Sequence, residues 1–317
     1  MSGPTTGGTN PTAPYPTGPS LGQDSGPQIL DRGYRSYDGP REGMSGSTRA
    51  LFVATMQRAL GLKRPFRFKI VPLLTAFVAY VPAMVFVGIS VVLRGDFLDD
   101  LREGVVPDYP DFYGNITLAI VLFVAFVAPE VMVTDRRTGM LGLYLAAPLT
   151  RPTYLASKVA SMFVLLLVVT VGPILFLMIG FVAIGIGPDG ILDFLGTLLR
   201  ILAAGTAVSL FFSAISLAIS SMAKRNGFAS AGIILLVFGS TVLANVVRES
   251  TDVGSWILLF DLLQVPFDVV TTIFGNVIRD GDDDAISATS AVLGYLVIVG
   301  ASLALSWYRF LRTSVTR

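Results

Sequence analysis

The charged residues best placed for chemistry beside the apolar parts of this chain lie in one stretch, residues 134–158. Its sequence is TDRRTGMLGLYLAAPLTRPTYLASK, and strongly apolar segments flank it on both sides. Thr134 or Asp135 can begin a helix here, because a short polar side chain accepts hydrogen bonds from the free N–H groups of a first turn. An apolar stripe follows at Met140, Leu141, Tyr144 and Leu145, before Pro148 interrupts the helix. Such a short amphipathic helix suits the binding of a soluble partner.

A second helix is expected directly after this one. Thr150 is placed to cap it, and Pro152 falls in its first turn, where proline is tolerated. The alternative is a solvated loop that only reverses the chain. A reversal needs few residues, however, and this stretch carries both caps and a stripe.

Catalytic chemistry has little to build on in this sequence. The chain contains no Cys and no His, which excludes Cys/His zinc sites, thiol nucleophiles, His general bases and disulfides. The nucleotide-binding pattern G-x-x-x-x-G-K-[S/T] does not occur. No basic surface with interleaved aromatic residues indicates nucleic-acid binding. We therefore expect no catalytic residue, no metal and no cofactor on this chain.

The elements that must position residues 134–158 are membrane spans. Hydrophobic residues make up 53% of the 317 residues and charged residues 14%, with a mean hydropathy of +0.70, whereas soluble domains carry about 25% charged residues. Six segments approach or exceed the roughly 20 apolar residues that cross a bilayer. They are Ile70–Leu93, Asn115–Val133, Tyr154–Gly187, Phe194–Met222, Phe228–Val247 and Ser287–Tyr308. The sequence therefore predicts an all-α integral membrane protein.

Two of these spans have special features. The third is over-long and contains Pro173, which is expected to kink it. The fourth is rich in Gly, Ala and Ser, and small residues let helix backbones approach closely. We therefore expect the fourth span to pack inside the bundle or at a subunit contact.

The segments outside the spans divide the rest of the chain. Residues 1–45 are rich in Gly, Pro, Ser and Thr and predict a disordered tail, which leaves residues 46–317 as the membrane domain. Residues 47–69 predict an amphipathic helix on the membrane surface. Its cations facing lipid phosphates would include Arg58, Lys63, Arg64 and Arg67. Residues 255–278 are apolar but interrupted by Asp261, Pro266 and Asp268, so they predict helices at the outer face rather than a seventh span.

The distribution of Lys and Arg predicts the orientation. All but five of the 23 such residues fall in the region before the first span, in the stretch 134–158, between the fourth and fifth spans or at the C-terminal end from Arg309 on. The five exceptions are Arg94, Arg102, Arg200, Arg248 and Arg279. By the positive-inside rule, both termini lie in the cytoplasm.

Few ionisable groups fall inside the predicted spans. Glu130, Lys158 and Arg200 are the main ones, and each lies near enough to a span end to reach the interface by snorkelling. An ion-coupled carrier normally holds such groups at mid-membrane. The scarcity of such groups argues against a secondary transporter or channel that acts alone. That class of protein is kept as an alternative, and so is a non-transporting scaffold in a membrane complex.

The stretch APEVMVTDRRTGMLGLYLAAPLTRPTYLASKVAS resembles the loop between the second and third spans of ABC-2 type transporter permeases. In that family a charged segment leads to a Gly, a Leu-rich turn, a Pro-Leu-[Ser/Thr]-Arg step and a Lys that opens the third span. The matching positions here are Asp135–Arg137, Gly139, Leu141–Leu145, Pro148–Arg151 and Lys158. The segment GYRSYDGPREG at 33–43 also resembles the N-terminal region of one bacterial branch of the family. The sequence departs from the family at 139–142, where Gly-Met-Leu-Gly replaces a common Gly-Thr-Leu-Glu turn.

The resemblance implies a permease subunit in the bacterial plasma membrane. It implies a dimer with a second copy or a related permease, and a separate ATPase subunit that binds ATP and Mg²⁺. Residues 135–147 would form the coupling helix, and its contacts with the ATPase would be Asp135, Arg136, Arg137, Gly139, Leu141 and Tyr144. Export is expected by resemblance, and the mostly apolar spans fit a hydrophobic or amphipathic substrate, although apolar spans also face ordinary lipid. The substrate-binding residues stay open.

Overall fold

Every element that the structure describes is a helix. The structure is a computed structural model, and it describes residues 43–62, 65–93, 99–140, 142, 144, 149–250, 255–276, 278 and 287–312. The chain divides into two units, Met1–Pro40 and Arg41–Arg317. The first unit lies outside the described residues, as does most of the predicted disordered tail.

Six of the described helices are long and apolar enough to cross a membrane, as the sequence predicted. They are α2 (Arg67–Val92), α4 (Phe112–Arg137), α6 (Arg151–Thr170) continued by α7 (Gly172–Ile184), α8 (Gly190–Met222), α9 (Asn226–Ser250) and α11 (Ala288–Leu311). The predicted bounds agree within a few residues. The predicted end at Val133 is four residues too early, because α4 continues through its charged last turn to Arg137.

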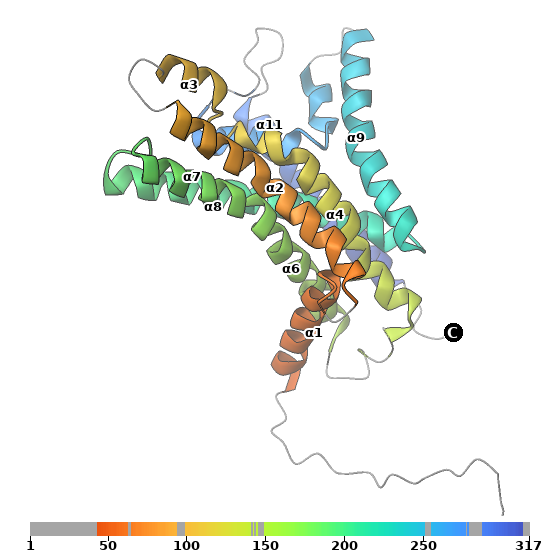
Figure 1. The fold of residues 1–317 in the computed structure, drawn as a ribbon. Coiled ribbons are helices and arrows are strands. Elements are labelled where there is room, and N and C mark those ends of the chain that lie inside the picture. Colours follow the sequence, from red (N-terminus) through yellow and green to blue (C-terminus); the bar gives the residue numbers. More distant parts are fainter. Residues whose placement is uncertain are drawn as a thin grey trace, which may run out of the picture. The chain divides into compact units, whose positions relative to one another are not determined.

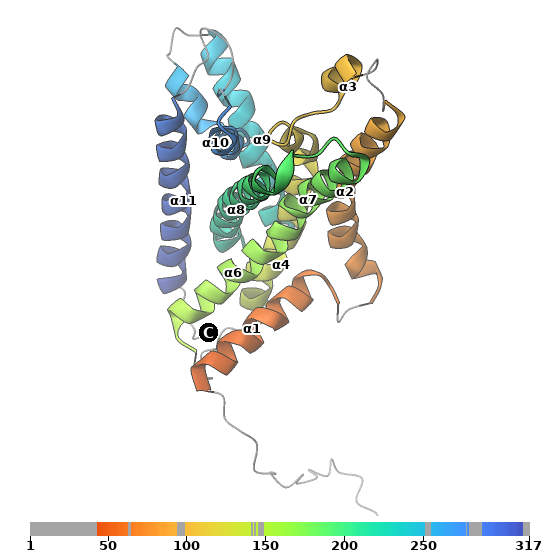
Figure 2. The same cartoon turned by 90° about the vertical axis from the view of Figure 1, so that its left-hand side faces the viewer.

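Shorter helices lie at the two ends of the bundle. The helix α1 (Gly43–Ala59) lies at one end, and α3 (Asp99–Val105) lies at the other (Figures 1 and 2). We call these the α1 end and the α3 end. The helices η2 (Ser255–Phe260) and α10 (Val265–Phe274) follow α9, which agrees with the prediction of short helices between the fifth and sixth spans.

The predicted surface helix over 47–69 is wrong in its extent. The helix α1 ends at Ala59, and Gly61 adopts a left-handed φ of 66°. The N–H of Leu62 then bonds to the carbonyl of Gln57 at 2.8 Å, a common way to close a helix with glycine. Lys63 and Arg64 lie outside the described residues, and Arg67 already begins α2.

The predicted kink in the third span is confirmed. The long span divides at Val171 into α6 and α7, with Pro173 in the first turn of α7 (Figure 1). The Thr170 hydroxyl lies 2.7 Å from the Ser209 hydroxyl and donates to the Gly205 carbonyl of α8 at 3.2 Å. A Cβ on Gly205 would collide with Val171. The small residues of α8 therefore let its backbone approach the bend between α6 and α7 closely.

The helices differ strongly in burial. In the most apolar 18-residue stretch of α4, and likewise of α8, 72% of the residues are buried. In the corresponding stretches of α9 and α11, 17% of the residues are buried. The helix α8 packs against α4, α6, α9, α10 and α11, which confirms that the fourth span lies inside the bundle. The apolar outer faces of α2, α9 and α11 are left for lipid or for a partner.

Candidate functional site

A buried cluster of charges joins three helices at the α1 end, and Asp135 is at its centre. Asp135 lies in the last turn of α4 and has no exposed surface. Its carboxylate forms ion pairs with Arg58 of α1 and, at 2.5 Å, with Lys158 of α6. The Tyr154 hydroxyl of α6 donates to the same carboxylate at 2.8 Å. One acid therefore fixes the ends of α1, α4 and α6 to one another.

Neutral groups complete the coordination of the two cations. The Lys158 ammonium donates to the Thr55 hydroxyl of α1 at 3.0 Å. The Arg58 guanidinium donates to the Tyr144 hydroxyl at 2.9 Å, and Tyr144 belongs to the segment that follows α4. Tyr144 is thereby held to α1.

The burial of these charges makes the cluster sensitive to change. The side chains of Asp135 and Lys158 are 0% and 1% exposed, and that of Arg58 is 23% exposed. Burial lowers the pKa of Arg58, but the hydrogen bond to Tyr144 and the charge of Asp135 outweigh it and leave that pKa above its ordinary value. Removing one member of a buried ion pair leaves an uncompensated charge and is strongly destabilising.

The neighbouring residue, Arg136, closes a different helix. Its guanidinium donates to the carbonyls of Ser221 at 2.6 Å, Ser220 at 2.5 Å and Ala223 at 3.2 Å. These are the free carbonyls at the C-terminal end of α8, where a positive charge is favoured by both hydrogen bonding and the helix dipole. Arg151 does the same for α11, since it donates to the Leu311 carbonyl at 2.8 Å.

A third contact joins α4 to the start of α9. The Asn226 amide donates to the Glu130 carboxylate at 2.8 Å, and the Thr134 hydroxyl donates to it at 3.2 Å. The turn between α8 and α9 is therefore held from both sides, by Arg136 and by Glu130. Together with Asp135, these residues make the last two turns of α4 the point at which five helices are connected.

The predicted coupling residues fall into different environments. Asp135 and Arg136 are engaged inside the protein, Tyr144 is half-buried, and Arg137 and Gly139 are exposed. Leu141 lies outside the described residues. The positive φ of 70° at Gly139 lets the chain turn directly after α4.

Three detailed expectations are wrong. Thr134 and Asp135 do not cap a new helix, because α4 runs through them without a break. Lys158 does not snorkel to the interface, since Asp135 and Thr55 satisfy its charge inside the bundle. Arg58 pairs with Asp135 rather than with lipid phosphates, and α1 packs against α6 and α4. The predicted cap at Thr150 is confirmed, because its hydroxyl accepts from the Thr153 N–H at 3.4 Å.

Sequence reasoning missed the partners of the charged residues. Thr55, Tyr154 and Asn226 were not singled out, and Arg58 was assigned to lipid. The available signal was Lys158, a lysine about one turn inside the predicted third span. Such a lysine needs an acid nearby, and Asp135 is the acid closest to it in sequence.

A protein-family model described as "ABC-2 family transporter protein" matches residues 96–308. The chain belongs to this family. The match runs from before α3 into α11, so it includes Asp135, Arg136 and Lys158, whereas α1 with Arg58 precedes it. No curated protein matches the chain in sequence.

Membership of the ABC-2 family has direct consequences. This ABC-2 chain is a multi-pass membrane protein and the permease of an ABC transporter, in bacteria at the plasma membrane. The family's membrane subunits are generally not catalytic, and their ATPase resides on a partner subunit.

Proposed function

We propose that this chain is the membrane-spanning subunit of an exporter and that its ATPase subunit acts on the end of α4. In this proposal the α1 end faces the cytoplasm, as the positive-inside rule predicts. Two such permeases pair in the membrane and open a path for a hydrophobic or amphipathic substrate. The helix α1 lies along the membrane surface.

The observation that carries the proposal is the set of contacts at the end of α4. Asp135 is bound to α1 and α6, Arg136 to the end of α8, and Glu130 to the start of α9. A force applied to the segment directly after α4 therefore reaches four other helices through hydrogen bonds and ion pairs. A flexible loop that only reverses the chain has no need for these connections.

The docking surface consists of the groups that the cluster leaves accessible. Arg137 and Gly139 are exposed directly beyond the last turn of α4. Arg137 would meet an acidic group on the ATPase, and the apolar residues that follow, Leu141 among them, would fill a groove beside it. Arg136 has an internal role instead, since its guanidinium already binds three carbonyls.

The two adjacent arginines provide a matched test. Arg137→Glu should weaken binding of the proposed ABC ATPase subunit about tenfold, which corresponds to about 1.4 kcal/mol, and should lower the stimulation of its ATPase activity. Its melting temperature should stay that of the wild type, because exposed substitutions change stability by about 0.5 kcal/mol or less. Arg136→Gln should instead lower the melting temperature.

A second measurement separates this function from the ion-coupled alternative. In proteoliposomes, substrate movement should require the ATPase subunit and ATP. Movement driven by a proton or sodium gradient with the chain alone would contradict the proposal. Unchanged ATPase binding by Arg137→Glu would leave the transporter assignment standing but would overturn this docking surface.

A further inference from the structure

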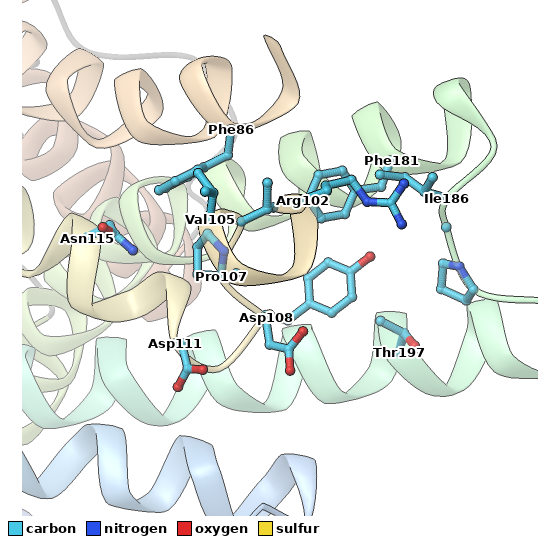
Figure 3. Close-up of a pocket in the computed structure, with 15 residues that line it drawn as sticks. Phe86, Arg102, Val105, Pro107, Asp108, Asp111, Asn115, Phe181, Ile186 and Thr197 are labelled. Atoms are coloured by element: carbon cyan, nitrogen blue, oxygen red, sulfur yellow. The ribbon is translucent and has the colours of Figure 1, made fainter. Parts of the chain in front are cut away.

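A large cavity lies at the α3 end, far from the charge cluster. Its volume is about 920 Å³, which is within the range of pockets that hold drug-sized molecules. The end of α2, the helix α3 with the loop after it, the end of α7 and the starts of α4 and α8 line it (Figure 3). The cavity therefore lies at the ends of the spans and between the loops that connect them.

Aromatic rings form part of the wall. Phe86, Tyr109 and Phe181 line the cavity, and the rings of Tyr109 and Phe181 lie 6.1 Å apart at a tilt of 52°. Tyr109 also stacks on Phe274 of α10 at 6.4 Å, which fixes its orientation. A cation within about 6 Å of a ring centre is attracted to the face of the ring.

Carboxylates form the polar part of the wall. Asp108 and Asp111 line the cavity and are exposed, and Arg102 is the one cation among its described lining residues. Figure 3 shows both Asp side chains directed to one side and the Arg102 guanidinium directed away from them. Arg102 also has an interaction of its own within the protein. The side of the cavity with the two acids is therefore negative.

The protonation of Tyr109 agrees with this environment. Burial and the nearby charge of Asp108 raise the pKa of Tyr109 to about 12, so the phenol is neutral at physiological pH. A neutral ring with an electron-rich face beside two carboxylates is the combination that recognises an organic ammonium group. An anionic ligand would meet repulsion from both acids.

We propose that this cavity binds an organic ammonium ion carried on an apolar body. Asp108 and Asp111 attract the charge, Tyr109 and Phe181 contact the ammonium substituents, and Phe86 and Ile186 contact the apolar part. Two sources supply this chemistry, namely the amine headgroup of a lipid and a water-soluble amphipathic cation. The proposed site does not depend on whether an ATPase drives the protein.

The proposal is tested by measuring the binding of phenyltrimethylammonium to the purified full chain in dodecyl maltoside. Equilibrium dialysis gives the amount of probe bound. We expect saturable binding of this probe and no binding of benzenesulfonate. The double variant Asp108→Asn/Asp111→Asn should weaken binding at least tenfold. Asp193→Asn is the matched control, because Asp193 is an exposed acid in the first turn of α8 that does not line the cavity.

The aromatic contribution is tested separately. Tyr109→Leu should weaken binding several-fold, whereas Tyr109→Phe keeps the ring and should bind like the wild type. The asparagine substitutions are mild, since the Asp111 side chain makes no capping hydrogen bond to α4. Melting temperatures of all variants establish that they fold.

The outcomes that would overturn the proposal are equal binding of benzenesulfonate, unchanged binding by the folded double Asn variant, or an equal loss in Asp193→Asn. Addition of phosphatidylethanolamine identifies the source. If this lipid displaces the probe from the wild type, the occupant is a lipid headgroup. If it does not, the site takes a water-soluble cation, and both results keep the ammonium site.

Discussion

Asp135 is the residue on which the α1 end of the bundle depends most. It is fully buried and binds two cations from two other helices. The cations exceed the acid in number, so the Tyr144 and Thr55 hydroxyl groups, which accept from Arg58 and Lys158, are needed to complete the site. A buried charge is stable only where such partners are in place.

Replacing Asp135 with Asn should therefore be severe. The amide keeps the shape of the carboxylate but leaves Arg58 and Lys158 without a negative partner, and the expected loss in the free energy of unfolding is about 3–5 kcal/mol. Thermal unfolding of the purified chain in detergent measures it. Arg137→Gln, two residues away and exposed, is the control and should change stability by about 0.5 kcal/mol or less.

A double variant isolates the pair itself. Lys158→Met removes the more deeply buried cation, so Asp135→Asn combined with Lys158→Met should lose less than the sum of the two single losses. Strictly additive losses would contradict a direct interaction between the two side chains.

At this scale the sequence allowed only part of the site to be predicted. It identified Asp135, Arg136 and Lys158 as unusual, because charges beside apolar spans are easy to recognise. It did not identify their partners, since Arg58 is 77 residues away from Asp135 in the chain. Pairing across that distance depends on how helices pack, which a single sequence does not specify.

The helices themselves were far more predictable. Long apolar runs give the six spans, a proline gives the kink between α6 and α7, and Thr150 gives a cap. These features depend on neighbouring residues and on bilayer thickness. The end of α4 was misplaced because hydropathy falls at the first charges, whereas the backbone hydrogen bonds of the helix continue to Arg137.

The close approach at the kink leads to a prediction about α8. A Cβ at Gly205 collides with Val171, whereas one at Gly196 meets nothing within 4 Å. Gly205→Ala should therefore cost about 1–3 kcal/mol through overpacking. Gly196→Ala, on the same helix, should be neutral or stabilise by up to about 1 kcal/mol through its helix propensity. Equal melting temperatures for the two variants would contradict the proposed packing.

For the whole molecule, the two ends of the bundle have different chemistry. The α1 end holds paired charges that connect helices, and the α3 end holds an open cavity with two exposed acids. A subunit driven by a soluble ATPase needs a rigid connection on one side of the membrane and a site open to solvent on the other. The proposed orientation gives the molecule this arrangement.

The natural absence of Cys makes that orientation directly measurable. Arg137→Cys lies at the α1 end and Asp193→Cys in the first turn of α8 near the α3 end, both exposed, in a chain with no other thiol. In intact cells a membrane-impermeant maleimide should label the Cys at 193 and should label the Cys at 137 only after permeabilisation. The reverse pattern would place the α1 end outside, where no ATP-driven subunit could reach Arg137, and the proposed coupling would then be impossible.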